Sequence, residues 1–139
     1  MFLLDTNAVS EARKVLSGRA NPGFAEWLVS TSAIQYYLST ISVFELEMGV
    51  LLMENRDARQ GASLRIWLDK QVKPTFVGRI LALDNEIAVC AAKLHVPKPA
   101  SDRDAFIAAT AMVHNLTLVT RNIRDFKRFP DLLLVCPWS

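Results

Sequence analysis

Three carboxylates and one amide occupy positions suited to chemistry in this sequence of 139 residues: Asp5, Glu45, Asp104 and Asn122. Asp5 closes a short apolar run, and Asn122 lies two residues past another. Oxygen atoms of these types are the ligands that Mg²⁺ and Mn²⁺ prefer. Neighbouring carboxylates repel one another, and a divalent cation removes that conflict. We therefore expect a metal site if the fold gathers the four residues.

Hydrolysis of a phosphodiester bond is the chemistry that such a site favours. A bound divalent ion lowers the pKa of a water ligand, orients the phosphate and stabilises the leaving oxygen. Neither histidine is placed for general-base work, since His95 and His114 lie near the ends of expected helices. Arg103 and Arg121 flank the expected site and are candidate phosphate contacts, with ordinary surface charge as the alternative. The residues predict a nuclease that depends on Mg²⁺ or Mn²⁺.

Each of the four positions also has a purely structural interpretation. Glu45 lies three residues after Ser42, which is the spacing of a capping box. Asp104 stands in the same relation to Ser101, and an acid in a first helical turn stabilises a helix by about 0.3–1 kcal/mol. The other two residues fit the polar end of a strand and a turn. Only their convergence at one place would distinguish a site from caps and turns.

The expected elements are strands that alternate with helices. Short apolar or β-branched runs predict five strands, over Phe2–Leu4, Tyr36–Ile41, Val77–Leu83, Thr117–Thr120 and Leu132–Val135. Periodic segments predict helices over residues 7–15, around 24–28, from Ser42 past Met53, over Asp57–Val72 with a stop at Pro74, from Asp84 or Asn85 to Leu94, from Ser101 to about His114, and a short one over Asp125–Arg128. This alternation predicts an α/β fold.

An open, mostly parallel, twisted sheet of about five strands with helices on both faces accounts for that alternation. In such sheets ligands bind at the carboxyl ends of the strands. Asp5, Glu45 and Asn122 each follow one of these ends, and the helix of Asp104 is expected to start at the same edge. The length suits one domain over residues 1–139.

Composition indicates the class of protein and its expected location, but it does not indicate an activity. Half of the chain (51%) is hydrophobic and 22% is charged, as in folded globular proteins. The net charge of +2 is too small to indicate nucleic-acid binding by itself. No apolar run approaches the roughly 20 residues of a membrane span, and the first residues lack the features of a secretion signal. We expect a cytoplasmic protein whose two cysteines, Cys90 and Cys136, are ordinary buried thiols.

Four segments, in this order and spacing, resemble the PIN-domain nucleases, and among them the VapC-type and FitB-type toxins of bacterial toxin–antitoxin pairs. The segments are Leu3–Asn7, Ser42–Leu46 with Gly49, Asp104–Ala111, and Leu118–Asn122 with Asp125 and Phe126. The resemblance runs nearly from end to end. It implies a PIN-like fold and a ribonuclease activity, and it implies that Asp5, Glu45 and Asp104 are the Mg²⁺ ligands.

The fourth acidic position of that family falls on Asn122, where many relatives carry Asp. Because Asn carries no charge, we expect one tightly held ion and a second ion that is recruited together with the substrate. Asp125 is the candidate carboxylate to replace the missing acid. Groups that hold the ligands by hydrogen bonds complete a metal site. The resemblance assigns that supporting role to four residues: Thr6, Asn7, Ser42 and Thr120.

The resemblance also implies partners. They are an RNA substrate, for which a tRNA is one expectation, an antitoxin protein, operator DNA reached only through that antitoxin, and a second copy in a homodimer. An antitoxin segment would lie in an apolar groove, for which the helices of Trp27, Leu46, Val50 and Leu51 are candidates beside their role in the core.

Two other functions compete with the nuclease. A PIN-like module of weak activity would bind an antitoxin and act with it on operator DNA, and Asn122 motivates this alternative. A phosphoaspartyl enzyme would use Asp5 as its nucleophile. It is disfavoured because Asn7 stands where a second acid is needed and no lysine closely follows Thr120.

Overall fold

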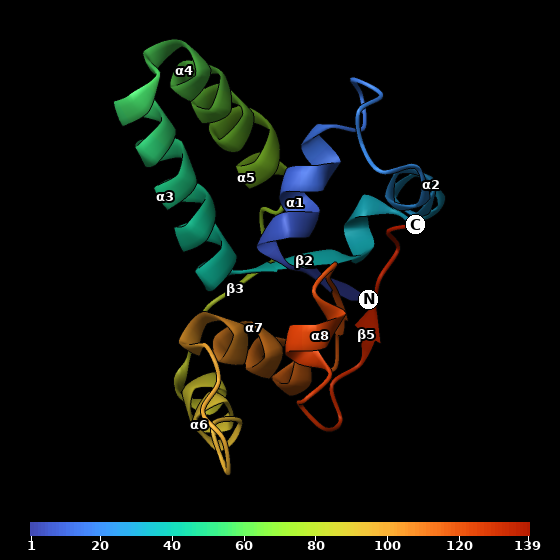
Figure 1. Cartoon of the computed structure of the whole chain (residues 1–139), viewed down its shortest axis with the longest axis vertical. Helices are drawn as coiled ribbons and strands as arrows, with labels where there is room; N and C mark the ends of the chain where they lie inside the picture. The colour runs from blue at the N-terminus through green and yellow to red at the C-terminus, as the bar shows by residue number, and fades with distance from the viewer.

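A five-stranded parallel sheet forms the centre of the molecule in the computed structural model, which describes all residues 1–139 (Figure 1). The strand order is β3-β2-β1-β4-β5, and every pair is parallel. The strands are β1 (Phe2–Leu4), β2 (Tyr36–Ser39), β3 (Ile80–Leu81), β4 (Thr117–Val119) and β5 (Leu134–Val135). The predicted α/β class is confirmed, with strands shorter than the apolar runs suggested.

Helices cover both faces of this sheet, as predicted. One layer holds α1 (Thr6–Arg13), α2 (Pro22–Ser30), α3 (Thr40–Arg56), α4 (Ala58–Trp67) and α5 (Lys73–Thr75), and the other holds α6 (Asn85–Lys93), α7 (Asp102–Val113) and α8 (Ile123–Phe126) (Figure 1). None of these helices has the length and apolar character that a bilayer crossing requires.

The central strand β1 joins two separate hydrophobic cores. Leu4 belongs to the cluster that contains Phe24 of α2 and Val50 of α3. Leu3 points to the opposite face and packs in the cluster of α7 and α8, which contains Ile107. Successive side chains of a strand face opposite ways, so a strand covered on both sides is apolar at every position. The continuous run in the sequence reflects this burial.

Helix α3 begins earlier than predicted, and this changes the role of Ser42. The first residue of α3 is Thr40, and the Ser39 hydroxyl accepts a hydrogen bond of 3.1 Å from the backbone N–H of Ser42. Ser39 is therefore the N-cap, and the capping box of Ser42 with Glu45 is wrong. Ser42 is fully buried instead. Its hydroxyl is free to contact the neighbouring helix α1.

Pro74 does not stop the helix that follows Asp57. The helix begins where predicted, with Asp57 as the N-cap of α4. A widened turn over Leu68–Val72 connects α4 to α5, in which Pro74 lies. The N–H of Lys73 reaches back five residues to the carbonyl of Leu68. A turn of this kind changes the positions of the carbonyls that a proline ring would otherwise strike. The rod formed by α4, the widened turn and α5 therefore continues to Thr75.

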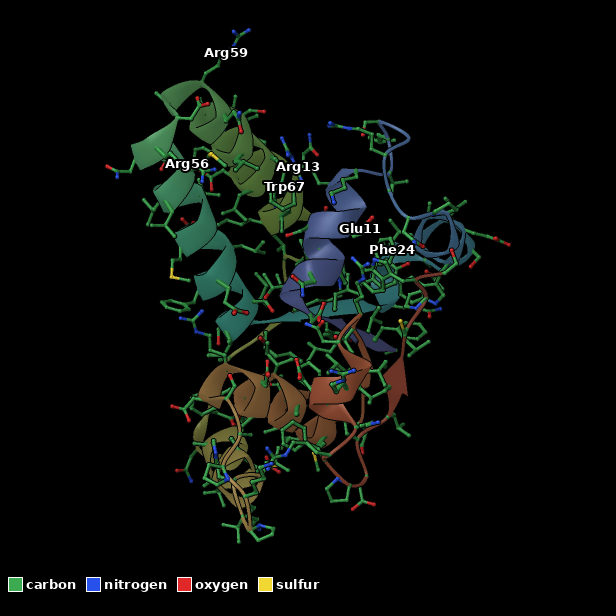
Figure 2. The ribbon with its side chains drawn as sticks, viewed as in Figure 1. Glu11, Arg13, Phe24, Arg56, Arg59 and Trp67 are labelled. Atoms are coloured by element: carbon green, nitrogen blue, oxygen red, sulfur yellow. The ribbon has the colours of Figure 1, made fainter.

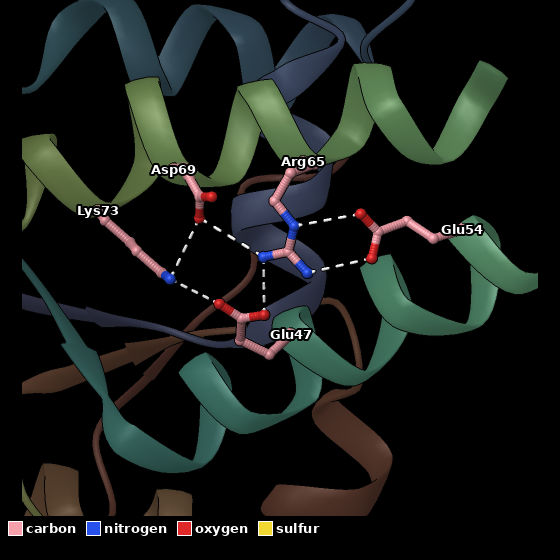
Figure 3. A network of polar contacts seen from close by, with 5 residues as sticks. All are labelled: Glu47, Glu54, Arg65, Asp69 and Lys73. Carbon is pink, nitrogen blue, oxygen red and sulfur yellow. Dashed lines mark hydrogen bonds and ion pairs between the residues drawn. The ribbon is translucent and has the colours of Figure 1, made fainter. Parts of the chain in front are cut away.

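The rod of α4 and α5 is joined to α3 by a network of ion pairs (Figure 3). Glu47 of α3 accepts from Arg65 at 2.8 Å and from Lys73 at 2.5 Å. Arg65 also pairs with Glu54 at 3.3 Å, and Lys73 pairs with Asp69 at 3.2 Å. Glu47 is therefore paired rather than solvated, and no local pattern shows this because its partners lie 18 and 26 residues away.

We expect Glu47→Gln to lower the free energy of unfolding at pH 7 by about 0.5–1 kcal/mol, the upper range for a partly exposed pair. Hydrogen bonds from Lys73 and then Arg65 hold the pKa of Glu47 below its usual 4.5. A lowered pKa stabilises the fold above the pKa of the unfolded chain, and this contribution disappears as the pH falls through the folded value. Urea unfolding at pH 7 and at pH 3 measures the difference.

The exposed carboxylate of Glu26, on α2, provides the matched control. Glu26→Gln should leave the free energy of unfolding unchanged at both pH values. A deficit of Glu47→Gln that persisted undiminished at pH 3 would show that packing, rather than charge, is lost.

Candidate active site

Asp5 is the buried centre of the candidate site. It follows β1, caps α1 by accepting the N–H of Ala8 at 2.8 Å, and is only 4% exposed. Burial raises the pKa of its carboxyl, repulsion from Glu45 and Asp104 raises it further, and hydrogen bonds with Thr120 and Ala8 oppose the shift. A charged carboxylate in this position is costly unless a cation compensates it.

Glu45 faces the same edge from α3 and is held by α1. The Thr6 hydroxyl donates to its Oε1 at 2.6 Å and lies 3.0 Å from the hydroxyl of Ser42. Thr6 has one proton and gives it to a group that only accepts, so the Ser42 hydroxyl must donate to Thr6. Glu45 lies beyond the first turn of α3, and the structure therefore rules out its capping interpretation. Thr6 therefore bonds this carboxylate directly, and Ser42 reaches it only through Thr6.

Asp104 reaches the edge from the first turn of α7. Ser101 caps this helix, and the N–H of Asp104 donates to its hydroxyl at 3.5 Å, as the spacing predicted. Burial raises the pKa of the Asp104 carboxyl, followed by repulsion from Asp125 and from Glu45. Asp104 therefore keeps its favourable place at a helix start and still belongs to the acidic cluster.

The fourth position is divided between an amide and a carboxylate. Asn122 is the exposed residue before α8, and its side chain makes no capping hydrogen bond. Its backbone N–H donates at 3.0 Å to the hydroxyl of Thr120, which in turn hydrogen-bonds Asp5. The charge of Asp125 acts on Asp104, together with that of Glu45. Thr120 thus links Asn122 to Asp5, while Asp125 adds negative charge that acts on Asp104.

The other predicted site residues lie around this cluster. Arg103 is 3.4 Å from Glu45, whereas Arg121 and the exposed Asn7 line a cavity of about 390 Å³ that also contains Asn122. The side chain of Asn7 makes no hydrogen bond with the three carboxylates that it was expected to support. Asp102, two residues before Asp104, is 84% exposed, and its carboxylate lies 3.4 Å from His95.

Glu11 is a mostly buried carboxylate of α1 with a hydrogen-bond partner outside its own helix. Its side chain is only 12% exposed and accepts the N–H of Asn21 at 2.7 Å. That bond lowers the pKa of Glu11 and connects α1 to the start of α2.

A hydrated Mg²⁺ or Mn²⁺ fits these donors better than an ion enclosed by protein. No three histidine, cysteine, aspartate or glutamate side chains are close enough together to hold one ion directly. The carboxylates of Asp5, Glu45 and Asp104 nevertheless act on one another through their charge. Mg²⁺ typically takes one or two carboxylates and keeps several waters. The donor set is thus suited to a cation that bridges the cluster partly through water.

Known proteins are similar in sequence to this chain over their whole length. Toxin FitB of Neisseria gonorrhoeae is 36% identical, with 99% of each chain covered. VapC ribonuclease Y4jK of Sinorhizobium fredii is 32% identical, with 100% of this chain and 99% of the relative covered.

Solved structures agree with these relatives. The crystal structure of FitAcB from Neisseria gonorrhoeae matches with a TM-score of 0.87 at 35% identity, over 100% of this chain and 99% of that one. A structure of FitAB bound to an IR36 DNA fragment matches with a TM-score of 0.87 at 33% identity, over 100% and 96%. The profile of the PIN domain covers residues 2–132. The chain belongs to the PIN-domain family.

Proposed function

We propose that this protein is an endoribonuclease dependent on Mg²⁺ or Mn²⁺, and that it acts in the cytoplasm as the toxin of a toxin–antitoxin pair. The observation that carries the proposal is the cluster of Asp5, Glu45 and Asp104 at the carboxyl edge of a parallel sheet, where each lies within the field of another. Such repulsion is costly in a protein with no use for a cation. The ribonuclease name of a full-length relative supports RNA as the substrate.

The residues of the chain divide the work of the reaction. A bound divalent ion supplies a water of lowered pKa and positive charge for the leaving oxygen. Asp5, Glu45 and Asp104 would hold that ion, the Thr6 hydroxyl fixes the orientation of Glu45, and Ser42 holds the Thr6 hydroxyl in turn. Supporting bonds of this kind reduce the freedom that a ligand loses on binding metal.

Two further residues complete the proposed reaction site. The amide of Asn122 makes no capping bond and is therefore available to orient a water or a phosphate oxygen. Arg121 lines the same cavity as Asn122 and is available to the phosphates of RNA.

An antitoxin is the proposed protein partner, and operator DNA is contacted only through it. The relatives seen as a FitAcB complex and as FitAB bound to DNA support this assignment. A cavity of about 300 Å³ with mostly hydrophobic walls lies between α1 and the rod of α4 and α5. Arg13 stands at its rim, with its guanidinium 5.7 Å from the ring centre of Trp67 (Figure 2). Such a groove suits an amphipathic segment.

A homodimer also belongs to the proposal. The surface available to a second copy is the outer side of α3, where Phe44, Leu51 and Leu52 are 53%, 57% and 64% exposed. Apolar side chains that gather on a surface commonly mark an interface. Leu46 and Val50, which sequence reasoning offered for a partner groove, are instead buried in the core of the chain.

Asp104→Asn tests the proposed reaction. We expect cleavage of a labelled RNA in Mn²⁺ to fall by more than about 100-fold, since losing even an indirect partner of a metal ligand costs 10–100-fold. EDTA should have the same effect on the unchanged protein. Asp102→Asn is the matched control, because it removes an exposed carboxylate two residues away on the same helix and should leave the rate unchanged. Cleavage that survives both EDTA and Asp104→Asn would reject the mechanism.

The binding-module alternative makes the opposite prediction. It expects tight antitoxin binding and no metal-dependent turnover of RNA, so turnover that Asp104→Asn abolishes would reject it. No feature of the structure favours this alternative over the nuclease.

A further inference from the structure

The two oxygens of Glu45 have different partners, from opposite layers of the molecule. Oε1 accepts the hydroxyl of Thr6 from α1 at 2.6 Å. Oε2 faces Arg103 of α7, whose guanidinium nitrogen lies 3.4 Å away. Thr6 is neutral and can keep its bond when a cation binds Glu45. Arg103 carries a positive charge and cannot share that oxygen with a metal ion at no cost.

Arg103 is also held over an aromatic ring next to Glu45. Its guanidinium carbon lies 5.2 Å from the ring centre of Phe44, which precedes Glu45 in α3. A cation within about 6 Å of an aromatic face is attracted to it. The guanidinium therefore has two independent contacts with α3 and spans the gap between the helices that carry two of the three candidate ligands. Both contacts place positive charge at the cluster without any metal.

We propose that Arg103 is the internal counter-ion of Glu45 and that a divalent cation must displace it from Oε2 to bind the site. This inference rests on the metal-dependent function proposed above and goes beyond it, because it assigns to the chain a residue that competes with its own cofactor. Arg103 thereby sets the concentration of free cation at which the site fills. It is a positioning residue for Glu45 in the metal-free protein.

Mn²⁺ binding measured by titration calorimetry tests the competition. Arg103→Gln should bind Mn²⁺ roughly 2- to 5-fold more tightly than the unchanged protein, the gain expected from removing one partly exposed ion pair. Arg121→Gln removes a cation at the same edge that pairs with no carboxylate, and it measures the general effect of charge. Arg59→Gln removes a cation from the start of α4, far from the site, where its side chain points away from the molecule (Figure 2). Neither control should match the gain of Arg103→Gln.

Thermal unfolding supplies a readout that does not depend on activity. In EDTA, Arg103→Gln should melt below the unchanged protein, because Glu45 loses its counter-ion. In saturating Mn²⁺ the two proteins should melt together, because the cation has replaced Arg103 in both. A purely structural role for Arg103 would give the same deficit in both conditions and would overturn the inference.

The possible results distinguish a failure of this inference from a failure of the proposed metal-dependent function. In one outcome the unchanged protein binds Mn²⁺, Asp104→Asn abolishes that binding, and Arg103→Gln binds no more tightly than Arg121→Gln. This outcome would overturn the role of Arg103 alone. Absence of Mn²⁺ binding by the unchanged protein would overturn the metal site, and the role of Arg103 with it.

Discussion

Asp5→Asn is expected to abolish metal-dependent RNA cleavage without unfolding the protein. The substitution removes the charge of the most buried candidate ligand, which is 4% exposed, and the rate should fall by more than about 100-fold. An asparagine oxygen still accepts the N–H of Ala8, and Asn and Asp cap helices about equally well. Cleavage of a labelled RNA in Mn²⁺ and circular dichroism of the same preparation measure the two effects.

Without metal and above acidic pH, the Asp5→Asn protein should also be more stable than the unchanged protein. Burial is the largest cause that raises the pKa of Asp5 above 3.8, so folding favours its protonated form. A raised pKa contributes stability that is complete below the unfolded value and is lost as the pH rises through the folded value. Asparagine has no such loss. Melting temperatures in EDTA between pH 4 and pH 8 should therefore diverge in favour of the variant as the pH rises.

Asp84→Asn is the control for helix capping. Asp84 caps α6 by accepting the N–H of Ile87 at 2.9 Å, as Asp5 caps α1, but it lies outside the acidic cluster. Its replacement should leave cleavage unchanged. If Asp5→Asn kept most of the cleavage rate, Asp5 would be a cap and nothing more.

The convergence of Asp5, Glu45 and Asp104 could be predicted because it depends on topology. A carboxylate at the end of a buried strand lies at the carboxyl edge of a parallel sheet wherever the strand sits in the order. Apolar runs and helix signals define the alternation of strands and helices without any knowledge of the strand order. The order β3-β2-β1-β4-β5 itself, and the central place of β1, depend on long-range pairing.

Contacts between distant side chains could not be predicted. Glu45 and Arg103 are 58 residues apart, and no local pattern pairs them. Ser39 and Ser42 both suit an N-cap, and only the end of β2 decides between them. The repulsion that Asp125 exerts on Asp104 comes from a residue 21 positions away and is likewise invisible in the local sequence. Local patterns determine elements, whereas tertiary packing determines partners.

Gly61→Ala is expected to destabilise the protein, although a local view predicts the reverse. Gly61 lies inside α4, where alanine is usually better than glycine by about 0.5–1 kcal/mol. A Cβ at this position would instead lie against the backbone of Glu54 on α3, 2.7 Å from its nitrogen and closer still to its Cα. Backbone atoms cannot turn aside as a flexible side chain does. The two helices must move apart to accept the methyl group.

The cost of that movement should exceed the gain in helix propensity. Inserting extra carbon into a packed contact typically costs about 1–3 kcal/mol. For a chain of this size the melting temperature should fall by roughly 4–10 °C. Separation of α3 from α4 also strains the pair of Glu54 with Arg65. Thermal and urea unfolding measure the change.

Gly49→Ala, in α3, is the matched substitution with the opposite expected sign. A Cβ at Gly49 meets no atom within 4 Å, so only the helix propensity changes. That variant should gain about 0.5–1 kcal/mol. The same chemical change in two adjacent helices should thus stabilise one variant and destabilise the other, because the close approach of α4 to α3 at Gly61 has no counterpart at Gly49. Equal gains in both would mean that the two helices are not packed as closely as the structure shows.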